Sequence, residues 1–101
     1  MAKKVAVIMG SDSDLSVMME TVEKLKLFHI PYEIRIIAAH RTPALAEQFA
    51  SSALDNGFGV IIAGAGKAAH LGGVLAAYTT LPVIGVPIKA SMMGGLDSLL
   101  S

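Results

Sequence analysis

The stretch VAVIMGSDSD, residues 5–14, decides the fold. Its first half, residues 5–9, is a nearly continuous aliphatic run, which is typical of a parallel strand covered on both faces. Its second half, residues 10–14, joins a glycine to serines and aspartates, which favour turns and helix starts. Apolar residues then recur at helical spacing, at Leu15, Met18, Met19, Val22 and Leu25. The segment therefore predicts a strand, a polar turn and an amphipathic helix.

The same alternation continues along the chain. Pro31 closes the first unit, and Thr42-Pro43 predicts a helix start with threonine as the N-cap and proline as the first helical residue. Asn56-Gly57 is expected to end that helix, whose apolar stripe is Leu45, Ala46, Phe49, Ala50 and Ala53. We expect strands at residues 5–9, 32–37, 60–63 and 82–86, a turn at 64–66, a helix at 68–78 and the start of another at 94–101.

Alternating strands and helices of this length predict right-handed βαβ units. We therefore expect residues 1–101 to form a single α/β domain, a doubly wound parallel sheet in a three-layer αβα arrangement. Because the chain ends just after a predicted helix begins, we expect the C-terminal strand and helices of the sheet to be absent from it.

The composition argues against several classes of protein. Eight Lys and Arg balance eight Asp and Glu, whereas a general nucleic-acid binder depends on many basic contacts to phosphates. With no Cys there is no disulfide framework, zinc–thiolate site or thiol nucleophile, and we expect a cytoplasmic protein. Only 16% of residues are charged, against about 25% in typical domains. Because small domains have much surface for their volume, this predicts self-association or missing covering segments.

A membrane span must also be considered. Residues 68–88 carry no Asp, Glu, Lys or Arg, and a helix of that length could cross a bilayer. His70, Pro82 and Pro87 interrupt the stretch, and an internal proline breaks a continuous helix. We therefore predict no membrane span.

Polar residues gather where the predicted strands end, and in open α/β sheets ligands bind beyond those carboxyl ends. The hydroxyls of Ser11 and Ser13, with free backbone N–H groups at a helix start, predict an anion site. Asp14 would repel a phosphate and is better suited to hold ribose hydroxyls. The alternative is that these serines and aspartates only cap the helix.

The next strand ends carry further candidates. Arg41 can clamp a phosphate and His40 can move a proton near neutral pH, although such a pair can also be surface decoration. The glycines of residues 64–66 would let backbone approach a ligand, but the Gly-x-Gly-x-x-Gly fingerprint fails because His70 occupies its last position. His70 itself could be an ordinary helix histidine. We interpret His29 as structural and the Met18-Met19 pair as core.

Several familiar mechanisms are missing from the sequence. It contains no Walker loop, no nucleophile elbow and no histidine spacing typical of a metal site. Flavin binding is conceivable from the serine-rich first loop, but no aromatic residue stands where it could stack on the ring.

Five ordered motifs carry a resemblance that covers essentially the whole chain: GSDSD (10–14), AHRTP (39–43), GAGxAAHL (64–71), LPVIGVP (81–87) and GLDSL (95–99). In these motifs the chain closely resembles the N5-carboxyaminoimidazole ribonucleotide mutases, the class I members of the aminoimidazole ribonucleotide carboxylase family. The resemblance implies a flavodoxin-like sheet, a homo-octamer and a small-molecule ribonucleotide substrate. It also implies movement of a carboxylate from N5 to C4 in purine biosynthesis, without metal, ATP or an organic cofactor.

Matching positions receive the family's roles. His40 would be the general acid and base, while Ser11, Ser13, Asp14 and Arg41 would bind the ribose phosphate part of the substrate. The third loop would surround the base and the carboxylate through Gly64, Ala65, Gly66, Ala68, His70 and Leu71. The implied alternatives are a carboxylase that uses free CO₂ and an inactive phosphoribosyl-binding fragment.

The chain departs from the family pattern in three ways. Lys67 and Gly72 stand where the family usually has a glycine and a proline, and Lys67 would either face solvent or add charge near the carboxylate. Ala38 stands where the family usually has a serine, which removes a hydroxyl near the site. Family members also continue past the last motif with another strand and C-terminal helices.

Overall fold

The computed structural model describes residues 3–38, 42–66 and 70–88. Its centre is a four-stranded, wholly parallel sheet with the strand order β2-β1-β3-β4. The strands are β1 (Lys4–Met9), β2 (Tyr32–Ile36), β3 (Phe58–Gly66) and β4 (Val83–Ile88). This order is that of the flavodoxin-like doubly wound sheet, so the predicted fold class is confirmed.

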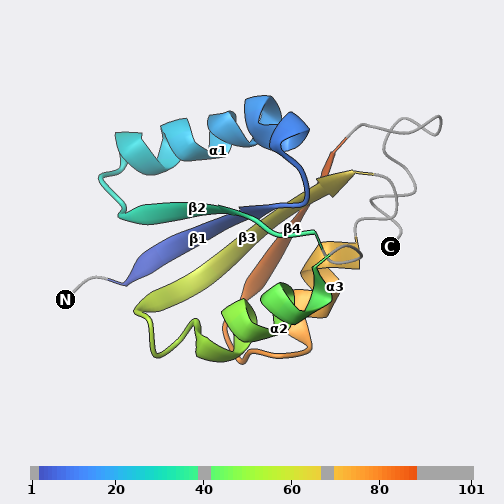
Figure 1. Cartoon of the computed structure of the whole chain (residues 1–101). Coiled ribbons are helices and arrows are strands. Elements are labelled where there is room, and N and C mark those ends of the chain that lie inside the picture. Colours follow the sequence, from blue (N-terminus) through green and yellow to red (C-terminus); the bar gives the residue numbers. More distant parts are fainter. Residues whose placement is uncertain (1–2, 39–41, 67–69, 89–101) are drawn as a thin grey trace.

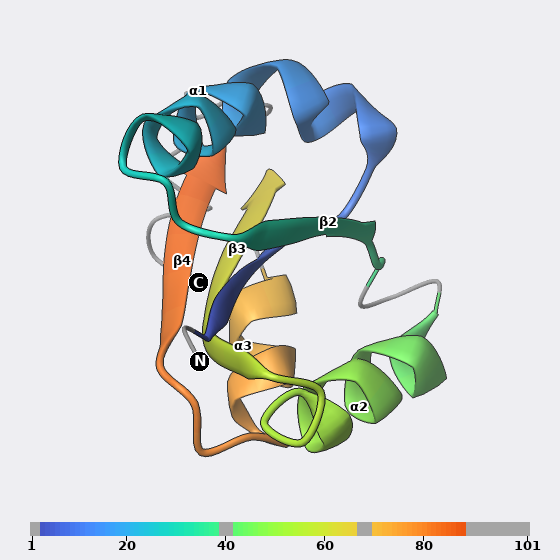
Figure 2. The same cartoon turned by 90° about the vertical axis from the view of Figure 1, so that its left-hand side faces the viewer.

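Helices cover both faces of the sheet (Figures 1 and 2). A short 3-10 turn, η1 (Asp12–Asp14), leads into α1 (Leu15–Leu27) on one face. The opposite face carries α2 (Pro43–Ser52) and α3 (His70–Ala76), which pack side by side. The three-layer arrangement expected from the sequence is therefore present in the part of the chain that the structure describes.

The two faces of β1 supply two separate cores because successive side chains of a strand point to opposite faces. The core under α1 holds Val5, Val7, Met9, Met18, Val22, Leu25 and Ile88. The core under α2 and α3 holds Ala6, Ile8, Ile37, Ala46, Ala50, Ala53, Phe58, Ile61, Ala63, Leu71 and Leu75. Burial on both faces explains why residues 5–9 form the unbroken aliphatic run that predicts this strand.

The predicted helix stripes are wrong at one residue each. Met18 is fully buried, as expected, but Leu15 and Leu45 are 39% and 51% exposed. Both lie in the first turn of their helices, α1 and α2.

Several predicted boundaries also need correction. Residues 64–66 form the end of β3 rather than a turn. All three pair with β4, and Gly64, opposite Met9 and Val86, also pairs with β1. The second helix ends at Ser52, and Asn56 and Gly57 belong to the turn after it, where Gly57 has φ +90°. The third helix is shorter than predicted, and the predicted helix at 94–101 lies outside the described residues.

The turn between α1 and β2 contains His29, whose φ of 56° lies in the left-handed region. Its backbone N–H donates to the Lys26 carbonyl, which helps to reverse the chain toward β2. The turn conformation agrees with the structural interpretation of His29.

Among the residues described, no helix has the length and apolar character needed to cross a membrane. The uncharged stretch 68–88 instead contributes α3 and the edge strand β4.

Candidate active site

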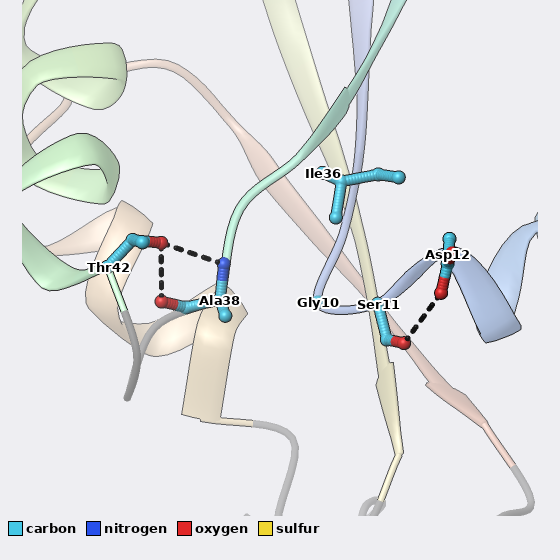
Figure 3. Close-up of a pocket in the computed structure, with 6 residues that line it drawn as sticks. All are labelled: Gly10, Ser11, Asp12, Ile36, Ala38 and Thr42. Atoms are coloured by element: carbon cyan, nitrogen blue, oxygen red, sulfur yellow. Dashed lines mark hydrogen bonds between the residues drawn. The ribbon is translucent and has the colours of Figure 1, made fainter.

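A pocket of about 520 Å³ lies at the carboxyl ends of β1 and β2. It is lined by Gly10, Ser11, Asp12, Ile36, Ala38 and Thr42. Figure 3 shows Ser11 and Asp12 on one side of it and Ala38 and Thr42 on the other. The position is the one that parallel α/β sheets use for ligands, and it brings together two of the predicted loops.

The first loop is held by its own serines. Ser11 is the N-cap of η1, and its hydroxyl accepts a hydrogen bond from the Ser13 backbone N–H at 3.2 Å. The Ser11 and Ser13 hydroxyls also lie 2.9 Å apart, within hydrogen-bond distance. The capping interpretation is therefore confirmed for Ser11. Because Ser11 also lines the pocket, its predicted contact with an anion stays open to test.

Asp14 lies between η1 and α1 and is 9% exposed. Burial raises the pKa of its carboxyl above the ordinary range, and a hydrogen bond from the Ser11 backbone partly opposes that rise. No side-chain capping bond is made by this residue, although it occupies the N-cap position of α1. Asp14 is not among the residues that line the pocket, so its predicted task of accepting hydrogen bonds from ribose hydroxyls stays a prediction.

Thr42 occupies the predicted N-cap position of α2, and Pro43 begins the helix as expected. The Thr42 side chain, however, makes no hydrogen bond to the helix. The hydroxyl instead donates to the Ala38 carbonyl at 2.9 Å and accepts from the Ala38 N–H at 3.2 Å (Figure 3). Sequence reasoning identified Thr42 only as a cap and missed its place in the pocket wall.

Gly64, near the end of β3, is closely packed within the protein. A Cβ on Gly64 would lie 2.9 Å from Met18 Cε, closer still to Met18 Sδ, and 3.2 Å from Ile88 Cδ1. Gly64 therefore allows β3 to lie close to the Met18 side chain of α1 and the Ile88 side chain of β4. In the described structure Gly64 has a packing role, because any side chain there would collide with the core.

The remaining predicted site residues have different positions. Leu71 is 2% exposed and packs in the core under α2 and α3, so its side chain is not available to a ligand. Ala65 lies on β3, partly buried against the same core, and Gly66 is the last residue of that strand. His70 begins α3. His40, Arg41 and Ala68 lie outside the described residues, as does Lys67.

Of the other residues that line the pocket, Gly10 and Asp12 belong to the first loop, which sequence reasoning placed at the sheet edge without assigning these two to the ligand. Ile36 was missed, and the signal that could have found it is its position at the carboxyl end of β2. Within the described ranges, no group of three or more His, Asp or Glu residues could hold a metal ion.

Comparisons with known proteins identify the family of this chain. Residues 4–101 match the AIR carboxylase family (AIRC). The chain is 61% identical, over 97 residues, to the N5-carboxyaminoimidazole ribonucleotide mutase of Pyrococcus horikoshii, covering 96% of this chain and 55% of the relative. It is 60% identical, over 94 residues, to the chloroplastic phosphoribosylaminoimidazole carboxylase of Vigna aconitifolia, covering 93% of this chain and 17% of the relative.

A solved structure also shares the fold of this chain. A crystal structure of a Treponema denticola PurE2 variant superposes with a TM-score of 0.88 at 28% identity, covering 100% of this chain and 65% of that one. The chain belongs to the AIR carboxylase family, as the motifs predict. It spans a little over half the length of the Pyrococcus relative.

Proposed function

We propose that this chain carries the substrate pocket of an N5-carboxyaminoimidazole ribonucleotide mutase, an isomerase of purine biosynthesis. The observation that carries the proposal is the pocket itself. It joins the serine loop after β1 to both ends of the segment that contains His40 and Arg41. These are the two loops to which the family resemblance assigns phosphate binding and proton transfer, and relatives with the mutase name are about 60% identical to this chain over nearly its whole length.

Each residue has a role in the proposal. Ser11, Ser13 and Arg41 would bind the ribose phosphate, and Asp14 would accept hydrogen bonds from ribose hydroxyls. The N5–carboxylate bond breaks to release CO₂ in the pocket, and N5 takes up a proton. C4 then attacks the CO₂ and loses its own proton. One shuttled proton suffices, so a single histidine, His40, can serve as acid and base.

The pocket wall contributes by confinement. Holding CO₂ beside C4 makes the second step effectively unimolecular, and this proximity would supply the rate acceleration. The roles of the β3 loop, including Ala68 and His70, belong to the same proposal, as do the homo-octamer and the cytoplasmic location.

A second function is favoured by one observation. The Vigna relative, named a carboxylase, is as similar to this chain as the Pyrococcus mutase is. The alternative reaction adds free CO₂ to C4 of unmodified aminoimidazole ribonucleotide.

The test is an assay without ATP on the purified chain, with either N5-carboxyaminoimidazole ribonucleotide or aminoimidazole ribonucleotide plus bicarbonate. We expect formation of the C4-carboxylated product above the spontaneous rate from the first substrate and little from the second. The reverse preference would support the carboxylase. Binding of both ribonucleotides without turnover of either would support the inactive-fragment alternative.

A further inference from the structure

The Thr42 hydroxyl forms two hydrogen bonds with one residue, Ala38. It donates to the Ala38 carbonyl at 2.9 Å and accepts from the Ala38 N–H at 3.2 Å. The Thr42 backbone N–H also donates to the same carbonyl, at 2.7 Å. A hydroxyl has one proton to donate, and a carbonyl oxygen has two lone pairs, so this three-bond arrangement uses the donor and acceptor capacity well. We refer to the three bonds between Ala38 and Thr42 as the clasp.

The clasp joins two rigid parts of the fold. On one side, Ile37 is buried and its N–H donates to the Met9 carbonyl at 2.9 Å, which fixes the chain just after β2 to β1. On the other side, the N–H groups of Leu45 and Ala46 donate to the Thr42 carbonyl and anchor the first turn of α2. The sequence between the clasp's ends is Ala39, His40 and Arg41.

The start of α2 does not account for the side-chain bonds. Pro43 already sets the first helical φ and has no N–H to be capped, and the Thr42 hydroxyl makes no bond to the helix. The hydroxyl is thus committed to closing the segment 38–42. Both of its ends line the pocket (Figure 3).

We propose that Thr42 is a positioning residue for the reaction: its hydroxyl fixes the span of segment 38–42 and so holds His40 and Arg41 at the pocket. The inference rests on the proposed function, which assigns chemistry to those two residues. Physically, tying the ends of a short segment removes many of its conformations, so the entropy of ordering the segment is lost during folding rather than during catalysis.

The experiment compares three variants of the chain. Thr42→Val removes the hydroxyl at nearly constant volume, and Thr42→Ser keeps it. Thr79→Val is the matched control, because the Thr79 hydroxyl also accepts a backbone N–H nearby, from Leu81 at 3.1 Å, but at the other end of the sheet. We expect Thr42→Val to lower kcat/KM of the mutase reaction by about 10–100-fold, since small displacements of reacting groups have effects of that size. Thr42→Ser should stay within about threefold of the wild type, because it keeps the donor and the acceptor, and Thr79→Val should leave kcat/KM unchanged.

Nuclear magnetic resonance supplies a readout that does not require turnover. In Thr42→Val, the Ala38 amide should exchange with solvent faster, and the ring resonances of His40 should change in chemical shift, because the ends of segment 38–42 are no longer tied by the hydroxyl. Neither should change in Thr79→Val. Wild-type turnover with an unaffected Thr42→Val, or His40 ring resonances identical in the two proteins, would overturn the inference. A wild-type chain without turnover counts against the proposed function, while the His40 ring resonances still decide the role of Thr42.

Discussion

At the scale of single residues, His40 and Arg41 divide the proposed work between chemistry and binding. Replacing His40 by Asn should abolish turnover, because the amide cannot shuttle the proton. Substrate binding should stay within about tenfold of wild type, since charge-assisted contacts to the phosphate supply most of the affinity. The assay without ATP measures the first effect and isothermal titration the second. Binding that is lost as completely as turnover would contradict this division of roles.

Asp14 makes a prediction about pH. Burial raises its pKa in the folded protein above the unfolded value, so ionised Asp14 destabilises the fold at neutral pH. This cost is fully present above the folded pKa and disappears as the pH falls through the unfolded pKa, where both states are protonated. We therefore expect Asp14→Asn to raise the free energy of unfolding at pH 7. The gain should shrink as the pH falls from the raised pKa of the folded protein toward about 4, the range of an unfolded carboxyl, and should be absent below it.

Urea unfolding of both proteins at several pH values measures this difference. The same variant should bind the ribonucleotide more weakly, because the amide is a poorer acceptor for the ribose hydroxyls than a carboxylate. A variant that is less stable than the wild type at pH 7 would show that the carboxylate stabilises the fold instead.

At the scale of elements, Gly64 shows how closely α1 approaches the sheet. Its Cβ would overlap the end of the Met18 side chain, which is fully buried and has little space to move. Gly64→Ala should destabilise the chain by about 1–3 kcal/mol, the usual cost of overpacking a core. Chemical denaturation measures it, with Gly73→Ala as a control because a Cβ there meets nothing within 4 Å. Gly73→Ala should leave stability unchanged or raise it, because alanine has the higher propensity within a helix such as α3. If Gly64→Ala is no less stable than the wild type, the contact with Met18 does not limit this position.

Elements with a clear hydrophobic pattern could be predicted from the sequence. The four parallel strands, and the helices between them, follow from aliphatic runs and 3.6-residue spacing, because these patterns reflect the burial that forms the elements. Two local features could not. Gly64–Gly66 has the composition of a turn, yet the chain there stays extended because all three residues pair with β4 and Gly64 also pairs with β1. Thr42 has the sequence context of an N-cap, and only the structure shows its hydroxyl turning back to Ala38.

The candidate site was predicted as a location rather than as a set of contacts. The carboxyl ends of β1 and β2 do form one pocket, and Ser11 lines it as expected. Leu71 and Gly64 were assigned to the ligand because their motif matches the family; the Leu71 side chain is buried in the core and Gly64 leaves no room for a side chain, while contact of the Gly64 backbone with a ligand stays a prediction. A sequence motif does not distinguish a residue that contacts a ligand from one that supports the loop beneath it.

At the scale of the whole molecule, the low charge of the chain has a structural counterpart at one edge of the sheet. β4, VIGVPI, has no charged residue, and within the described residues it pairs only with β3. Ile84 of this strand is 52% exposed. It lies on the same face of the sheet as Val86 and Ile88, which belong to the core under α1, because alternate residues of a strand share a face. Exposed edge strands normally carry charges that prevent association with other chains. An uncharged edge therefore favours an interaction that covers it.

We accordingly expect the 101-residue chain to self-associate through the β4 edge, and Ile84→Lys to weaken that association. A lysine on the exposed face would have to be desolvated against the partner, whereas in the free chain its ammonium stays in water. Sedimentation velocity over a range of concentrations should show the variant shifted toward the monomer. Leu27→Lys is the control, since Leu27 is 64% exposed but lies at the end of α1. If both variants shift the equilibrium equally, nonspecific contacts between apolar surfaces cause the association. If only Ile84→Lys shifts it, the chains associate at β4, and the low charge of the sequence reflects this interface.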